Sequence, residues 1–128
     1  MVQIAQAQTY NLTVMVTNIK SLKGEIKIGV YNNKASFPHT KDMYKSLTIK
    51  VNSYSESFTI KDLSKGDYAV ALFHDKNSDG ICNRNFLGIP EEAYGFSNNY
   101  RPILSVPSFN NCRINLHDNM QIVIKLIL

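Results

Sequence analysis

Residues 68–73 read YAVALF, and every position in this run is apolar. A strand with one face in water alternates apolar and polar residues, whereas a strand covered on both faces is apolar throughout. The turn residues Lys65-Gly66 lead into the run. We therefore predict a central strand here, with other parts of the chain covering both of its faces.

Elsewhere the chain shows the alternation that is typical of half-buried strands. Apolar residues recur at every second position in further short runs, at residues 12–16, 26–30, 47–51, 58–60, 114–116 and 122–126. No helical period is sustained over several turns. Short strands without β-α-β spacing predict an all-β fold, a single seven-stranded β-sandwich of immunoglobulin-like or transthyretin-like type spanning residues 10–128.

The charge of the 128-residue chain is dispersed. Its 14 Lys and Arg against 10 Asp and Glu give a formal net charge of +4. Most lysines fall between Lys20 and Lys65 among polar residues, whereas nucleic-acid surfaces combine Arg with stacking aromatics. We therefore expect solvated strand faces and no nucleic-acid partner. No window approaches the roughly 18 uninterrupted apolar residues of a membrane helix, so we expect no membrane span. We also expect a monomer.

The residues before the first strand pattern contain one short motif. Ala5-Gln6-Ala7 has the small-x-small form that signal peptidases cleave. Residues 1–9 are therefore either the remainder of an export signal or a disordered N-terminus. The first interpretation predicts a secreted or periplasmic protein.

Residues 74–111 do not fit the strand pattern. They contain turn formers, prolines and several aromatic side chains, but no clean alternation. Loops of this length in compact domains are usually functional or disordered, and aromatic side chains argue against disorder because they bury large areas. We predict one long ordered loop laid down on the sandwich.

The start of this loop has the oxygen spacing of a calcium site. Asp75, Asn77 and Asp79 place oxygen side chains at alternate positions and are followed by a glycine. This is the first half of a calcium-binding loop, in which Ile81 would contribute a carbonyl oxygen and Asn83 a further oxygen or a water contact.

The second half of that calcium motif is missing. Phe86 stands where a helix-loop-helix site has its bidentate glutamate, so closure would fall to Glu91, Glu92 or water. Two interpretations stay open. Either the loop binds Ca²⁺ weakly, at about 10⁻⁴ to 10⁻³ M, or its side chains form a metal-free polar turn.

The chain has two cysteines, Cys82 and Cys112, both in loop-like sequence. In an exported protein an even pair favours a disulfide, whereas in the cytosol the same pair favours free thiols. We predict a bridge between them, with free thiols as the alternative.

Four spaced blocks, taken together and in order, resemble a known family. They are residues 73–80 (FHDKNSDG), 85–90 (NFLGIP), 94–99 (YGFSNN) and 107–109 (PSF). The chain is similar from residue 12 to residue 126 to the bacterial exported proteins grouped as domain of unknown function 2141. The resemblance implies a secreted or periplasmic β-sandwich related to transthyretin-like domains, with no assigned activity. Family members often carry Asp where this chain has Asn83, which lowers the expected calcium affinity, and the two cysteines are not part of the family pattern.

The functional hypothesis is a non-enzymatic exported module whose loop forms a surface for a protein or carbohydrate ligand. Aromatic side chains stack on sugars or cover peptides, and polar side chains orient them. The predicted ligand-contacting residues are His74, Glu91, Tyr94, Phe96, Asn98 and Arg101. The aromatic members of this set have the alternative role of core filler.

Two other functions are compatible with the same residues. A metal- or carboxylate-dependent hydrolase would use His74, Asp75 and either Glu91 or Glu92 as its acid and base. A purely structural, envelope-associated protein would need no site at all.

Overall fold

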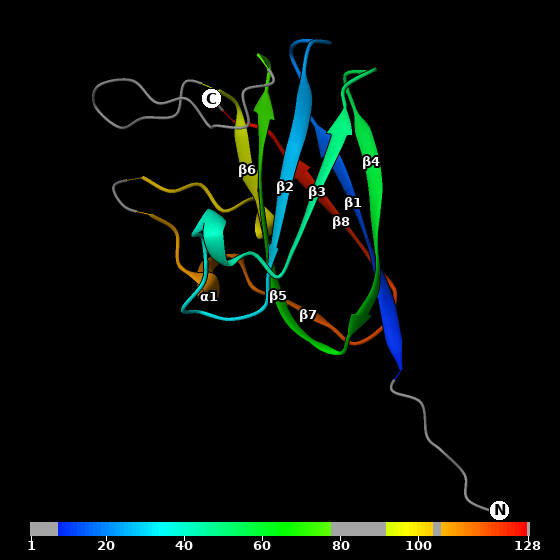
Figure 1. The fold of residues 1–128 in the computed structure, drawn as a ribbon, viewed down its shortest axis with the longest axis vertical. Coiled ribbons are helices and arrows are strands. Elements are labelled where there is room, and N and C mark those ends of the chain that lie inside the picture. Colours follow the sequence, from blue (N-terminus) through cyan, green and yellow to red (C-terminus); the bar gives the residue numbers. More distant parts are fainter. Residues whose placement is uncertain (1–7, 78–91, 104–105, 128) are drawn as a thin grey trace, which may run out of the picture.

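The computed structural model describes residues 8–77, 92–103 and 106–127 (Figure 1). This part of the chain is mostly β-strand, with very little helix, so the predicted all-β class is confirmed. The strands are β1 (Thr9–Thr17), β2 (Glu25–Tyr31), β3 (Lys45–Lys50), β4 (Glu56–Ser64), β5 (Gly66–Asp75), β6 (Tyr94–Phe96), β7 (Ile114–Leu116) and β8 (Met120–Lys125). The helical segments are η1 (Thr40–Asp42), η2 (Ser97–Asn99) and α1 (Phe109–Cys112).

The strands form two sheets. The first has three strands in the order β4-β1-β8, in which β1 is antiparallel to β4 and parallel to β8. The second has five, in the order β3-β2-β5-β6, with β7 also paired to β5. On the edge of β5 that faces away from β2, β7 pairs with Gly66–Tyr68 and β6 pairs with Ala71–Phe73. β5 therefore lies in the middle of its sheet.

Both faces of β5 are covered, as its uniformly apolar sequence predicts. Tyr68, Val70 and Leu72 belong to the main core, which lies between the two sheets. Ala69 belongs to a second cluster on the other face, against which Ala71 also packs. The prediction of a central strand covered on both faces is confirmed.

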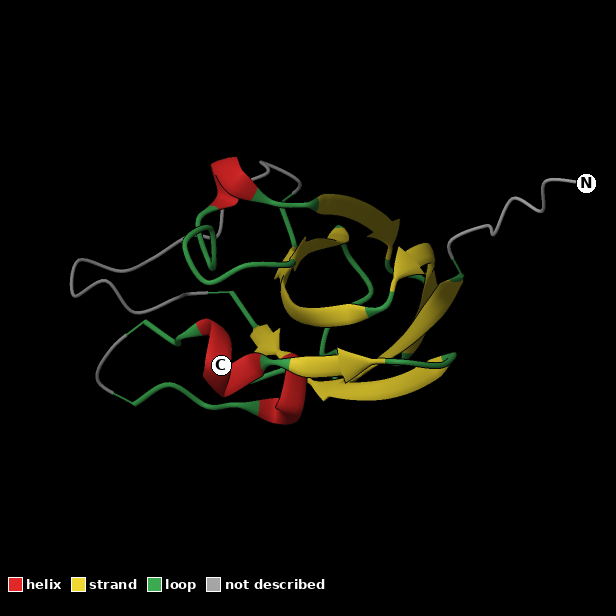
Figure 2. Ribbon diagram, turned by 90° about the horizontal axis from the view of Figure 1, so that it is seen from below, coloured by secondary structure: helices red, strands yellow, loops and turns green. Residues whose placement is uncertain are grey.

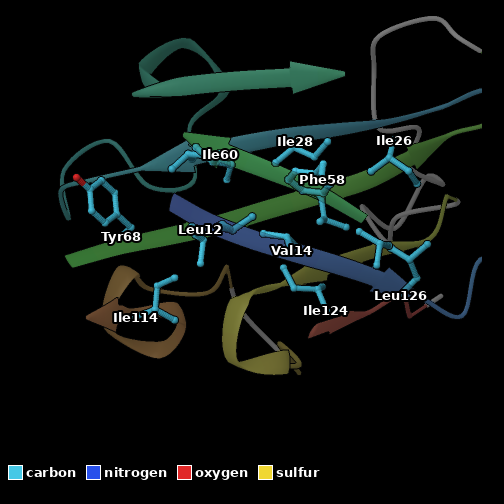
Figure 3. Packing of buried hydrophobic residues seen from close by; sticks show 14 of the residues in the cluster. Leu12, Val14, Ile26, Ile28, Phe58, Ile60, Tyr68, Ile114, Ile124 and Leu126 are labelled. Carbon is cyan, nitrogen blue, oxygen red and sulfur yellow. The ribbon is translucent and has the colours of Figure 1, made fainter. Parts of the chain in front are cut away.

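Side chains from both sheets meet in the main core (Figure 3). Leu12 and Val14 of β1 and Ile124 of β8 are fully buried there, opposite residues such as Ile26 and Ile28 of β2. Each such aliphatic side chain contributes about 1.5–3 kcal/mol of burial free energy. Apolar and polar residues alternate along the other strands because every second side chain faces solvent, where a polar residue needs no buried hydrogen-bond partner.

The second cluster lies on the outer face of the five-stranded sheet. Phe37 is at its centre, with ring centroids 5.0 Å from Tyr31, 6.2 Å from Phe96 and 6.2 Å from Phe109. The fully buried Cys112 completes the contact with Ala69. The helical segments gather on one side of the sheets (Figure 2). The second cluster therefore covers the face of β5 that points away from the main core.

The segment predicted as one long loop, residues 74–111, contains more regular structure than its sequence indicated. Its described residues include β6, η2 and α1, which brings the described strands to eight rather than the predicted seven. β6 is three residues long with Gly95 at its centre, and glycine is depleted in strands, so its sequence did not indicate one. The expectation that aromatic residues lay this segment on the sheets holds for Phe96, Tyr100 and Phe109.

The first strand begins at Thr9, and residues 1–7, most of the predicted N-terminal segment, lie outside the described residues. Within the described ranges, no helix combines the length and apolar character needed to cross a membrane.

Gly95 of β6 makes a tight contact that generates a prediction. A Cβ at this position would come 2.6 Å from the Cγ2 atom of Ile124 in β8. Overpacking of this kind costs about 1–3 kcal/mol, so Gly95→Ala should lower the free energy of unfolding by that amount in urea titrations. In an Ile124→Ala background the clashing atom is gone and the loss should shrink, whereas in Ile124→Val, which keeps that atom, it should persist. An equal loss in all three backgrounds would contradict the packing described here.

Burial raises the pKa of the Cys112 thiol to about 12. Because the thiolate is the reactive form, we expect Cys112 to resist iodoacetamide at pH 8 in the folded protein and to react once the chain is unfolded in urea without reductant. Peptide mass spectrometry measures both. Modification of Cys112 only after reduction would instead establish the disulfide with Cys82.

Candidate functional site

An open cleft of about 480 Å³ lies where β6 and η2 meet the end of β8. Its lining comes from separate parts of the chain that the fold brings together. The described lining residues are Asn18, Gly95, Phe96, Asn99, Tyr100, Arg101, Lys125, Leu126 and Ile127. Two of the residues predicted to contact a ligand, Phe96 and Arg101, are among them.

Backbone hydrogen bonds fix the floor of this cleft. Tyr94 and Ile127 form an antiparallel bridge, in which the Tyr94 amide donates to the Ile127 carbonyl over 2.9 Å and the Ile127 amide donates to the Tyr94 carbonyl over 2.8 Å. The amide of Leu126 donates to the carbonyl of Thr17 over 3.0 Å. The end of the chain therefore joins the three-stranded sheet to the five-stranded sheet underneath the cleft.

Two asparagine side chains, from Asn18 and Asn99, bind the segments beside the cleft to residues 123–126 at its base. The side chain of Asn99 accepts from the Lys125 amide over 2.8 Å and donates to the Val123 carbonyl over 3.2 Å. The side chain of Asn18 donates to the Leu126 carbonyl over 2.8 Å. Asn99 takes the place of a missing strand on the edge of β8 that faces away from β1, whereas Asn18 continues the pairing of β1 with β8.

The backbone conformation at these positions accounts for the choice of asparagine. Asn18, Asn98 and Asn99 have φ angles of 64°, 65° and 51°. This left-handed region is strained for most side chains, but Asn tolerates it because its short amide bonds locally to the backbone. The same residue type thus makes the sharp turn and closes the strand edge.

The cleft is electrically positive. Arg101 and Lys125 are both exposed at its rim, and its described lining contains no Asp or Glu. Within the described part of the chain, the ion pairs join Lys27 to Glu25 and Arg113 to Asp67, so neither cation of the cleft has a carboxylate partner there. The cleft therefore favours a negatively charged guest.

The other residues predicted to contact a ligand have different positions. Tyr94 is half-buried and its ring packs edge-on against Phe96, with centroids 5.9 Å apart. Asn98 does not line the cleft, because its side-chain amide donates to the carbonyl of Arg113 over 2.8 Å. Glu91 lies outside the described residues. Asn99 is thus the asparagine of this pair that faces the cleft.

His74 is buried at the opposite end of β5 from β7. Its Nε2 atom lies 2.6 Å from the carbonyl oxygen of Lys23, so Nε2 carries the proton and donates to that carbonyl. Its side chain is 2% exposed. His74 therefore acts as a packing residue that ties the chain before β2 to the end of β5.

The carboxylates next to His74 are also buried. Asp75 is 0% exposed and Glu92 is 5% exposed. Glu92 accepts from the backbone amide of Lys76 over 2.9 Å, and Asp75, Asn77 and Glu92 each have further interaction partners. The residues proposed for hydrolysis that lie in the described ranges, His74, Asp75 and Glu92, therefore all interact with other parts of the fold.

Of the predicted calcium ligands, only Asp75 and Asn77 lie in the described residues. Asp79, Ile81 and Asn83 lie outside them, as does Cys82. Across residues 8–77, 92–103 and 106–127 there is no group of three or more His, Cys, Asp and Glu side chains placed to hold a metal. Cys112 is a free thiol in the structure, and the predicted bridge to Cys82 is the alternative that the iodoacetamide experiment tests.

Sequence reasoning missed Asn18, Asn99, Tyr100 and Lys125 as lining residues. Asn18, the Asn99-Tyr100 pair and Lys125 are far apart along the chain. The parallel pairing of β1 with β8 brings Asn18 close to Lys125, and the side-chain bonds of Asn99 bring η2 to the same place. The one local signal was the Asn98-Asn99 pair, a turn-forming dipeptide directly after a short strand.

Comparison with known proteins gives one finding. None of the curated proteins or solved structures compared with this chain matches it. A family model described as "Uncharacterized protein conserved in bacteria (DUF2141)" matches residues 14–123, which include most of both sheets and the β6 and η2 wall of the cleft. The chain therefore belongs to this bacterial family, DUF2141.

Proposed function

We propose that the protein is an exported, non-enzymatic binding module, a β-sandwich of immunoglobulin-like or transthyretin-like type whose ligand occupies the cleft between η2 and β8. The observation that carries the proposal is the cleft itself, which combines aromatic, amide and cationic side chains on a fixed floor. Ligand sites commonly measure about 300–1,000 Å³, and this cleft falls in that range.

The contacts under the cleft support binding because they reduce the cost of ordering on association. The Tyr94–Ile127 bridge and the side-chain bonds of Asn18 and Asn99 hold the walls in place without a ligand. A site that is already ordered loses less conformational entropy when it binds.

The aromatic lining supports a guest with apolar surface. Phe96 and Tyr100 are each half-buried, since they pack against the second cluster but still line the cleft. A ring anchored in this way offers its exposed part as a rigid contact surface. Tyr100 adds a hydroxyl group to this surface, which can hydrogen-bond a polar guest.

Calcium is the second part of the proposal. Asp75 is the last residue of β5 and Asn77 follows two positions later, so the first part of the predicted ligand loop starts from a strand that is paired with both β2 and β6. The spacing of Asp75, Asn77 and Asp79 supports Ca²⁺ as the ion. We propose that Ca²⁺ stabilises this loop and that it has no chemical role in the cleft.

Binding in the cleft predicts a localised response in NMR titrations of ¹⁵N-labelled protein. A panel of neutral and acidic mono- and disaccharides at millimolar concentration should shift the amide signals of residues 95–101 and 125–127. Tyr100→Ala should weaken that binding several-fold, and Tyr54→Ala, which removes a tyrosine 62% exposed outside the cleft, should leave it unchanged. Binding elsewhere on the surface, or no binding by any member, would overturn the proposal and favour a structural envelope protein.

Calcium binding predicts a dependence of thermal stability on ion concentration. At a Kd of about 10⁻⁴ to 10⁻³ M, 10 mM Ca²⁺ should stabilise the folded protein by roughly 1.4–2.7 kcal/mol relative to chelator. The melting temperature should rise with Ca²⁺, and Asp79→Asn should reduce the rise. Sodium chloride at matched ionic strength is the control. A melting temperature that is the same in chelator and in about 10 mM Ca²⁺ would remove the calcium part of the proposal.

A further inference from the structure

We propose that the cleft recognises a sugar acid, a ring ligand that carries a carboxylate group. This inference rests on the proposed binding function and names its ligand class. Three features of the cleft carry it: the cations at its rim, the closed strand edge at its floor, and the aromatic and amide groups of its walls.

The two cations come from different elements. Arg101 follows η2, and Lys125 is the last residue of β8. Like charges on one small cleft repel each other, and within the described residues no carboxylate offsets them. Binding of an anion relieves this repulsion, and the gain is larger in a cleft than on an open surface because water screens the charges less.

The two cations fit an oxyanion, and the occupied backbone amides favour a carboxylate over a phosphate. A guanidinium group is planar and binds the two oxygens of a carboxylate in parallel, whereas an ammonium group acts as a point charge. Arg101 and Lys125 therefore provide one directional contact and one non-directional contact. Phosphate sites also use free backbone N–H groups, but here the amides of Lys125 and Ile127 are already donors to Asn99 and Tyr94.

The floor of the cleft argues against a peptide ligand. A peptide that adds a strand needs unpaired backbone groups along a sheet edge. On the edge of β8 that faces away from β1, the Val123 carbonyl and the Lys125 amide are bonded to Asn99. The amide and carbonyl of Leu126 point the other way and are bonded to Thr17 and Asn18. Ile127 is bonded at both its backbone groups to Tyr94. These bonds leave no continuous ladder of unpaired groups between Val123 and Ile127 for an incoming strand.

The walls fit the neutral part of a sugar. Phe96 and Tyr100 present aromatic surface on which the C–H face of a sugar ring can stack. Asn18 and Asn99 are part of the lining, and each side-chain amide has more hydrogen-bonding positions than its backbone contacts use. These are the groups that sugar hydroxyls bind.

Calorimetric titration of the full chain tests the ligand class with matched pairs of probes. Digalacturonic acid is compared with neutral galactobiose, and glucuronic acid is compared with glucose and with glucose 6-phosphate. We expect each acid to bind at least tenfold more tightly than its neutral match and more tightly than the phosphorylated sugar. The affinity for the acid should fall as sodium chloride is raised, because salt screens the ion pairs.

Substitutions separate charge from geometry. Arg101→Gln should lower the affinity for the acid about tenfold, Arg101→Lys should restore part of it, and Lys125→Gln should lower it several-fold. Lys50→Gln, which removes an exposed charge on β3, is the matched control and should change nothing. Far-ultraviolet circular dichroism and melting temperature confirm that each variant is folded.

The outcomes distinguish the two proposals. Equal affinity for acidic and neutral sugars, unchanged in Arg101→Gln, would overturn the sugar acid and leave the binding module standing. Tighter binding of glucose 6-phosphate would overturn the carboxylate as the recognised group. No binding by any probe, in a protein that is folded, would overturn both proposals.

Discussion

The first and last strands of the sheets, β1 and β8, pair in parallel from Leu12–Met120 to Thr17–Lys125. This pairing is the constraint on which the rest of the structure depends. It completes the three-stranded sheet, places Ile124 in the main core, and carries residues 126–127 across to β6. Without it the core would lose one wall and the cleft would lose its floor. The candidate site is therefore a consequence of how the sheets are joined.

The strands could be predicted from the sequence because alternation reports burial directly. β1, β2, β4 and β5 are long enough for their periods to be visible, and the uniform run at residues 68–73 identified the strand that is covered twice. β6 was missed because Gly95 stands at its centre and turn-forming residues follow it, whereas β7, which has the same length, was visible because Ile114 and Leu116 flank a polar residue. The sequence predicted that the aromatic residues of the 74–111 segment would pack against the sheets, but it did not predict where. Their partners on β2 and β5 could be identified only once the structure showed which face of the sheet points away from the main core.

The candidate site was predictable in part. Phe96 and Arg101 were identified because they lie in a long segment rich in aromatic residues, where binding surfaces are common. Asn18 and Lys125 had no such context, and only the pairing of β1 with β8 brings them to the same cleft. Asn98 and Asn99 are adjacent and chemically identical, so sequence alone could not tell which one packs against α1 and which one faces the cleft.

The pairing of the two end strands also bears on how the protein is made. A growing chain can form the β2-β5 pairs as soon as residue 75 has emerged, but β1 must wait for β8, whose paired residues lie 108 positions further along the chain. Until then β1 has only β4 beside it, and the apolar side chains that Ile124 and Leu126 later cover stay open to solvent. Exposed apolar surface and unpaired strand edges favour aggregation, so the long sequence separation between β1 and β8 exposes the chain to this hazard for longer than pairing between neighbouring strands would.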